Sequence, residues 1–306
     1  MSKSQFAISN DRIVLLIVVL AIVSSVAAAD DEMDLLWKDA CQWEVGSAIP
    51  SMRAARDKLI AKGAKSLDYI IPGKLDTADG LVIRAIDEVV TKVGGEAVER
   101  LLPCLESDRP NVRKVTASLL GKLGAKEAAP RIAKLLGDPD ARGGALEALG
   151  MLKSTEAVPQ IGELLATAPL ERTKVACIGT LALIGGEEAE AVILTYLSAK
   201  AAPVRFAAQL ALEKLKAVEP LRARLKDEDA RVRLHAIAAL GHIGDAAAHD
   251  DLLGLLDSAS AVERGFAAEA IAAMLKPEDG ERLKAVLAKE TDPFAKGKLE
   301  AALSPR

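Results

Sequence analysis

Apolar residues recur along this chain in pairs of short segments, each with the spacing of one helical face. Between positions 236 and 243 they stand at i, i+3, i+4 and i+7, and a second stripe follows at positions 252–256. Side chains with this spacing lie on one face of an α-helix. No alternating run typical of a β-strand interrupts the pattern. The pattern therefore predicts a helix, a turn and a second helix, repeated along the chain.

The helix pairs repeat at a nearly constant interval. Each unit opens with an anchor position that is mostly basic and often follows valine, as in Val232-Arg233. Consecutive anchors are 28 to 32 residues apart. The anchors are Ile83, Arg113, Arg142, Lys174, Arg205, Arg233, Arg264 and Lys296. Self-similarity of this period predicts a stacked array in which each unit contacts its neighbours, and such arrays present extended binding surfaces.

Glycines and aspartates mark the predicted ends of the helices. Glycine favours the left-handed backbone conformation that closes many helices. The glycines that share one offset after the first segment are Gly94, Gly124, Gly185 and Gly244. An aspartate four residues before an anchor is expected to cap the first helix of its unit. Such aspartates are Asp138, Asp229 and Asp292.

These residues resemble the HEAT-repeat superfamily, in particular the short bacterial repeats of phycobilisome lyases. The resemblance rests on the opening Asp229–Arg233, the middle Ala236–Gly241 and the terminal Leu123-Gly124. Tetratricopeptide repeats are the nearest alternative, but their aromatic signature is absent here. The resemblance covers nearly all of residues 50–306 and implies an all-α fold, a right-handed α-solenoid of about eight two-helix repeats with helical caps. It also implies that first helices line the convex side and second helices the concave side.

The two ends of the chain differ from the repeats. The apolar run at 13–23, followed by small residues up to Ala29, is typical of a cleavable secretory signal over residues 1–29. An uncleaved anchor is the alternative, although the run is shorter than the roughly 20 residues that span a bilayer. Residues 30–49, with Trp37 and Trp43, are expected to form an N-terminal capping helix, and 294–303 a C-terminal one. An exposed aromatic contact site is the alternative interpretation of the two tryptophans. The protein is therefore expected to be exported, periplasmic or extracellular, with membrane contact only if the segment stays uncleaved.

Composition narrows the classes of partner. The 40 basic and 44 acidic residues give a net charge of −4, and no basic run stands out, so we expect no nucleic-acid partner. Export permits disulfides. Cys177 occupies a position held by small apolar residues in other units, which predicts a buried thiol. A bridge between Cys41 and Cys104 stays an open alternative.

The three histidines, His235, His242 and His249, are spaced by seven residues within one unit. Seven helical residues rise about 10.5 Å, too far for His235 and His242 to share one metal ion. Deoxyhypusine hydroxylase, a HEAT-repeat metalloenzyme, holds iron with His-Glu pairs, and no such pair occurs here. Phosphate-binding loops, nucleophile elbows and CxxC pairs are likewise absent from the sequence. We therefore expect no catalytic residue, no bound metal and no cofactor.

The favoured function is an exported interaction scaffold that binds a protein or peptide along its concave face. The predicted second helices supply the candidate contact residues. These are Arg131, Lys134, Gln160, Glu163, Thr195, Arg222, Asp251 and Arg282. The alternatives are a metal-dependent or lyase-type enzyme or its accessory subunit, and a structural envelope component that self-associates. Metal analysis of the purified protein, combined with replacement of the three histidines, would distinguish the first alternative.

Overall fold

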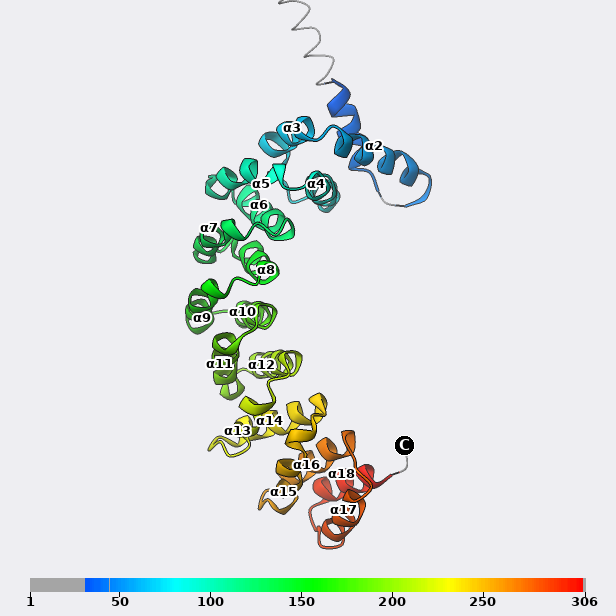
Figure 1. Ribbon diagram of the computed structural model, residues 1–306, viewed down its shortest axis with the longest axis vertical. Coiled ribbons are helices and arrows are strands. Elements are labelled where there is room, and N and C mark those ends of the chain that lie inside the picture. The colour runs from blue at the N-terminus through cyan, green and yellow to red at the C-terminus, as the bar shows by residue number, and fades with distance from the viewer. Residues whose placement is uncertain (1–30, 44, 305–306) are drawn as a thin grey trace, which may run out of the picture. The chain divides into compact units, whose positions relative to one another are not determined.

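The structure, a computed structural model, describes residues 31–43 and 45–304 and is built of helices throughout this part of the chain. The predicted secretory signal, residues 1–29, lies outside the described residues. The packing divides the chain between Ala125 and Lys126 into two units, which are described separately. In both units pairs of helices follow one another along the chain (Figure 1). The prediction of an all-α solenoid is confirmed.

The first unit contains a helical segment at residues 31–40 and then three helix pairs or parts of pairs. Its elements are η1 (Gly46–Ala48), α2 (Ile49–Ala61), α3 (Ala64–Lys74), α4 (Gly80–Val93), α5 (Glu96–Leu101), η2 (Leu102–Glu106) and α6 (Pro110–Lys122). The 31–40 segment packs on this unit: Trp37 is buried edge-on against Tyr69 of α3, and Arg56 of α2 donates to the carbonyl oxygen of Ala40. Trp43, by contrast, is 68% exposed.

The second unit continues the pattern with five first helices, which open with or just before an anchor residue, and with six second helices, one before the first of them and one after each. The first helices are α8 (Arg142–Leu152), α10 (Glu171–Ile184), α12 (Ala202–Leu215), α14 (Ala230–Ile243) and α16 (Ala261–Ala273). The second helices are α7 (Ala129–Lys134), α9 (Val158–Thr167), α11 (Glu187–Leu194), α13 (Val218–Arg224), α15 (His249–Gly254) and α17 (Asp279–Leu287). Short 3-10 turns adjoin them: η3 (Lys126–Ala128), η4 (Leu135–Gly137), η5 (Thr155–Ala157), η6 (Thr195–Ser198), η7 (Ala246–Ala248) and η8 (Leu255–Asp257). A final helix, α18 (Pro293–Leu303), packs on α16 and α17, as predicted for a C-terminal cap.

The anchor arginines explain why one residue type recurs at this position. The guanidinium groups of Arg205, Arg233 and Arg264 each donate to the carbonyl oxygen six residues earlier, at distances of 2.7 to 2.8 Å. These carbonyls lie just after the end of the preceding second helix or its 3-10 turn, where backbone acceptors lack a helical partner. The same bond is made by Arg113 and Arg142. The repeated arginine thus closes one helix pair and positions the next.

The predicted caps are largely confirmed. Four glycines after first helices have positive φ angles, at Gly94, Gly124, Gly185 and Gly244. Asp229 and Asp292 accept backbone N–H groups at the starts of α14 and α18. Asp138 was predicted to cap α8, and this is wrong. Its side chain accepts from the backbone nitrogen of Asp140, inside the turn, because α8 begins only at Arg142.

Within the second unit the first helices pack directly on one another, whereas successive second helices touch mainly through their short turns. Small residues allow this close approach: a Cβ atom at Gly241 of α14 would lie 2.6 Å from the Cβ of Ala270 in α16. Where one layer is packed more tightly than the other, the array bends toward it. Accordingly, the first helices lie on the inner side of the bend in this unit and the second helices on the outer side (Figure 1).

Candidate binding groove

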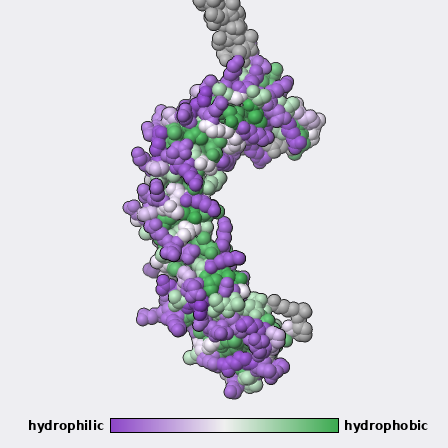
Figure 2. All heavy atoms as spheres, in the orientation of Figure 1, coloured by the Kyte–Doolittle hydropathy of each residue, from purple (hydrophilic) through white to green (hydrophobic). Residues whose placement is uncertain are grey.

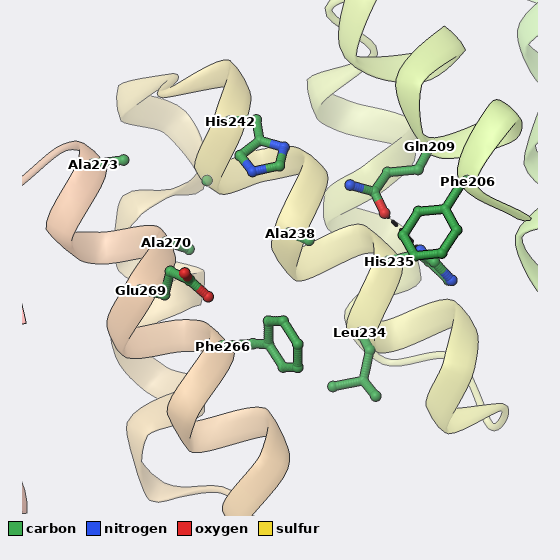
Figure 3. Close-up of a pocket in the computed structure, with 11 residues that line it drawn as sticks. Phe206, Gln209, Leu234, His235, Ala238, His242, Phe266, Glu269, Ala270 and Ala273 are labelled. Atoms are coloured by element: carbon green, nitrogen blue, oxygen red, sulfur yellow. Dashed lines mark hydrogen bonds between the residues drawn. The ribbon is translucent and has the colours of Figure 1, made fainter. Parts of the chain in front are cut away.

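A groove of about 560 Å³ lies on the inner side of the second unit, above the first helices α12, α14 and α16. Its floor is α14, which offers the small Ala238 and Gly241 between Leu234 and His242. Phe206 and Gln209 of α12 stand on one wall, and Phe266 and Glu269 of α16 on the other (Figure 3). The small floor and large walls together form a trough along the axis of α14.

The groove belongs to an inner face that keeps large apolar side chains in contact with solvent. Phe206 is 56% exposed and Leu210, one turn further along α12, is 60% exposed. Leu183 of α10 and Met151 of α8 are also exposed. Apolar residues reach the surface among polar ones on the visible face of this unit (Figure 2). Contiguous exposed apolar side chains typically mark a surface that contacts another molecule.

Aromatic contacts hold the walls of the groove in place. The ring of Phe206 meets the imidazole of His235 edge-on, with centroids 5.4 Å apart. On the other side Phe266 packs on Phe294 of α18, with centroids 5.7 Å apart. Such pairs add about 0.5–1.5 kcal/mol beyond area burial in favourable geometry. The rings are therefore fixed in part by neighbours within the chain.

Hydrogen bonds between polar side chains connect α12 to α14 beside the apolar residues of the groove. Gln209 Nε2 donates to Glu213 Oε1 at 2.8 Å, and Gln209 Oε1 lies 2.6 Å from His235 Nδ1, which must therefore donate (Figure 3). His242 Nδ1 lies 2.8 Å from the same Glu213 oxygen. Burial and the nearby charge of Arg205 lower the pKa of His235 below its ordinary 6.5. This imidazole is thus neutral near pH 7.

The third histidine belongs to a different cluster. His249, at the start of α15, is 2% exposed, and its Nε2 lies 2.8 Å from Asp279 Oδ2 in α17. Burial lowers the pKa of His249, but hydrogen bonds to Asp279 and Asp250 outweigh burial and leave the pKa raised. The pair joins two successive second helices, and neither residue lines the groove. The sequence spacing of seven therefore does not bring the three histidines together.

The eight candidate contact residues all lie on second helices or their turns, but not on the inner side. The structure places Arg131 and Lys134 on α7, Gln160 and Glu163 on α9, Thr195 on η6, Arg222 on α13, Asp251 on α15 and Arg282 on α17. It pairs Arg222 Nε with Asp251 Oδ2 at 2.6 Å. Because the tightly packed first helices form the inner layer, these residues do not line the concave face to which the sequence interpretation assigned them. Whether they contact a partner from the outer layer stays a prediction.

The groove residues were not predicted from the sequence, although their spacing along it indicates an exposed apolar face. Positions one, five and nine residues after an anchor lie one turn apart on a first helix, and in α12 the first two are Phe206 and Leu210. Large apolar residues there fall outside the core stripe formed by Ala208, Ala211 and Leu212, so they had to face solvent or a ligand. The pattern could have located the exposed face.

The described residues offer neither a metal-binding cluster nor a reactive thiol. Within 31–43 and 45–304 no group of three or more histidine, cysteine, aspartate or glutamate side chains is placed to hold a metal ion. Cys41, Cys104 and Cys177 are free thiols, so Cys41 and Cys104 are not bridged in this structure. Burial raises the pKa of Cys41 and of Cys177 to about 11, which disfavours the reactive thiolate. No helix of the described chain has the length and apolarity to cross a bilayer.

This chain resembles known proteins mainly in its fold. HEAT repeats are matched at residues 98–176 and 218–304. No curated protein matches the sequence. Among solved structures, the CpcE–CpcF complex of phycocyanin lyase from Nostoc sp. PCC7120 is 23% identical, with 78% of this chain and 93% of that chain covered and a TM-score of 0.40.

Two structures of Kap121p align with higher TM-scores. The one bound to Pho4p is 12% identical, covering 90% of this chain and 38% of that chain, with a TM-score of 0.58. The one bound to the extreme C-terminus of the protein phosphatase Cdc14p is 13% identical, covering 98% and 42%, with a TM-score of 0.55. The chain thus spans less than half of Kap121p, and the likeness concerns the fold.

Proposed function

Because the chain belongs to the HEAT-repeat family, we propose that it is an exported, non-catalytic scaffold that holds a protein or peptide partner on the inner face of its first helices. The observation that carries the proposal is the row of exposed apolar side chains on that face, centred on Phe206 and Leu210 beside the groove. Leaving these side chains in water costs roughly 25 cal/mol per Å² of apolar area, which a partner would recover.

Export and the kind of partner rest on further observations. The segment up to Ala29 has the composition of a secretory signal. The balanced charge and the absence of a basic run favour a protein or peptide over a nucleic acid. Kap121p, which shares the fold, is bound to Pho4p in one structure and to a C-terminal segment in another. A protein segment is the kind of ligand that we propose here.

Site-specific photocrosslinking in the native cell tests the proposal. A photoreactive phenylalanine analogue replaces Leu210 on the inner face, and in a matched control it replaces Gln160 on α9 in the outer layer, which is also exposed. We expect an adduct of discrete mass at position 210 and none at position 160. Adducts only at 160 would place the partner on the outer layer and refute the inner-face proposal. Absence of adducts at both positions would argue against a scaffold function.

A second variant separates partner binding from an accidental crosslink. Phe206→Ser removes a neighbouring exposed ring without disturbing the core, since this side chain is largely in solvent. We expect it to weaken the adduct formed from position 210 while leaving the helical circular dichroism unchanged. An undiminished adduct would mean that the crosslink does not report on the apolar face.

A further inference from the structure

The groove is formed by helices alone, and this restricts the ligand's conformation. α12, α14 and α16 satisfy their backbone hydrogen bonds internally, so between their ends they offer no free backbone donors or acceptors. An extended peptide in the groove would bury N–H and C=O groups with few partners. A ligand helix pairs its own backbone and brings only side chains into the trough. The groove therefore favours a helix over an extended segment.

The two ends of the trough differ in chemistry. Phe206, Leu234 and Phe266 come one or two residues after their anchors and make one end apolar. Toward the other end Gln209 and His242 line the trough. Glu213 of α12, seven residues after Phe206, does not itself line the groove but is hydrogen-bonded to both of these side chains. At 1.5 Å per residue the two levels are about 10 Å apart, or two turns of a helix. A helix lying along the trough would meet both levels.

Glu213 differs from other carboxylates of the first-helix layer in its partners. Its side chain is 16% exposed, and its hydrogen bonds come from the amide of Gln209 and the imidazole of His242. Glu263 and Glu269 of α16, by contrast, are paired with Arg233 and Lys298. Within residues 31–43 and 45–304 no lysine or arginine forms an ion pair with Glu213. A carboxylate can accept more hydrogen bonds than the two that Glu213 receives here, so it can also accept one from a ligand cation.

Resting on the proposed function, we infer that the groove recognises an amphipathic α-helix of a partner protein. The helix presents two large apolar residues one turn apart to Phe206, Leu234 and Phe266. It presents a lysine or arginine, two turns from the first apolar residue, to Glu213. The small side chains of Ala238 and Gly241 on the floor leave room for a ligand helix to approach α14 closely. Figure 3 shows Ala238 between the two walls. Apolar burial provides affinity, and the carboxylate fixes the register.

Designed peptides test the inference on the full-length protein. The probe is a fluorescent helical peptide of about 18 residues, with leucines at i and i+4 and a lysine at i+7. A second peptide carries the same pattern in reverse order, since a helix could lie in either direction. A third has glutamine in place of the lysine, and a fourth has a central proline that breaks the helix. Fluorescence anisotropy measures the dissociation constant of each.

We expect saturable binding of one lysine peptide, weakened about tenfold in the glutamine peptide and lost in the proline peptide. Glu213→Gln should weaken binding of the lysine peptide by a similar factor and leave that of the glutamine peptide unchanged. Glu163→Gln, which removes an exposed carboxylate from the outer α9, is the matched control and should change nothing. Thermal melts of both variants check that the helices remain folded.

Three outcomes would overturn the inference. These are the absence of saturable binding by either lysine peptide, equal binding of the proline peptide, and equal loss of both peptides in Glu213→Gln. The result is separable from the proposed function. If position 210 crosslinks a partner in the cell while the helical peptides fail, the scaffold function stands, and the helix with its basic residue is refuted. If both experiments fail, both proposals fall.

Discussion

Replacement of Gly241 by alanine tests whether the spacing of the inner layer is set by residue size. Gly241 lies within α14, where its missing side chain lets α16 come close. A Cβ atom at this position would lie 2.6 Å from the Cβ and 2.7 Å from the Cα of Ala270. Neither atom can move by a rotamer change, since both are fixed to the backbone of α16. The two helices must therefore separate by about 1 Å to restore carbon–carbon contacts of roughly 3.5–4.0 Å.

The expected free-energy change has two opposing parts. Forcing an extra methyl group into a packed interface costs about 1–3 kcal/mol. Alanine within a helix is more favourable than glycine by about 1 kcal/mol. The net destabilisation of Gly241→Ala is thus about 0–2 kcal/mol. Gly179→Ala in α10 is the matched control, because nothing lies within 4 Å of its Cβ position. That variant should gain up to about 1 kcal/mol, so the difference between the variants isolates the steric cost.

Urea denaturation of the full chain, followed by circular dichroism, measures both variants. Because a stacked array does not have to unfold as one unit, hydrogen exchange of the amides in α14 and α16 gives the local opening energy as well. We expect faster exchange in these two helices for Gly241→Ala and no change there for Gly179→Ala. If Gly241→Ala is as stable as Gly179→Ala and exchanges like the wild type, the close approach of α14 and α16 does not depend on glycine.

Three further predictions concern buried charges and processing. Arg264→Gln should destabilise the protein by about 3 kcal/mol in urea melts, because it leaves Glu290, whose side chain is 2% exposed, without its cation. The hydrogen bond from Arg264 lowers the pKa of Glu290 to about 2, so the stability difference between wild type and Arg264→Gln should shrink as the pH is lowered toward 2. The pKa of His249 is raised in the folded protein, so its protonation stabilises the fold fully below pH 6.5, the ordinary pKa, and this stabilisation is lost as the pH rises through the folded-state pKa. The stability difference between wild type and His249→Asn should therefore decrease from pH 6 to pH 9. A difference that does not depend on pH would contradict this prediction. Sequencing of the mature exported protein should begin at Asp30 if the signal is cleaved as its composition predicts, whereas an N-terminus at Met1 would indicate an anchor.

Helix positions and caps could be predicted from the sequence because they depend on local properties. Gly244 adopts a φ of +67° after α14, as its offset indicated. Lys153 and Lys216 adopt the same left-handed region, with φ angles of 51° and 53°. The packing of the repeats thus ends these helices in a left-handed conformation even where the residue is a lysine, which disfavours that conformation. The failure at Asp138 is also local: the loop there is long enough for an aspartate turn before α8 begins.

The inner and outer layers could not be assigned from hydrophobic periodicity, because both helices of a pair carry an apolar stripe. The difference lies in side-chain size at the contacts between first helices. Gly150, Gly241 and Gly265 each stand against a residue of the next first helix or of α18, at Cβ distances of 3.0 Å or less. Only a comparison of residue volumes along the two layers would have predicted the direction of the bend. The hydrogen bonds through Gln209 and Glu213 join side chains from different repeats, which no single repeat reveals.

Arginine–glutamate pairs tie together the repeats around the groove, and this matters for binding. Arg233 bonds the carboxylate of Glu263 at 2.6 to 2.7 Å, linking α14 to α16. Arg264 in turn binds both oxygens of Glu290, ahead of α18. These pairs are made by the same residues that close the preceding helix pair, so each arginine fixes the position of its own helix and of the next. A groove between helices held in this way loses little conformational entropy when a ligand enters. Weakening this arginine ladder should therefore reduce affinity for a helical peptide without removing any contact to it, and Arg233→Lys, which keeps the charge but not the planar fork, is the variant that tests this dependence.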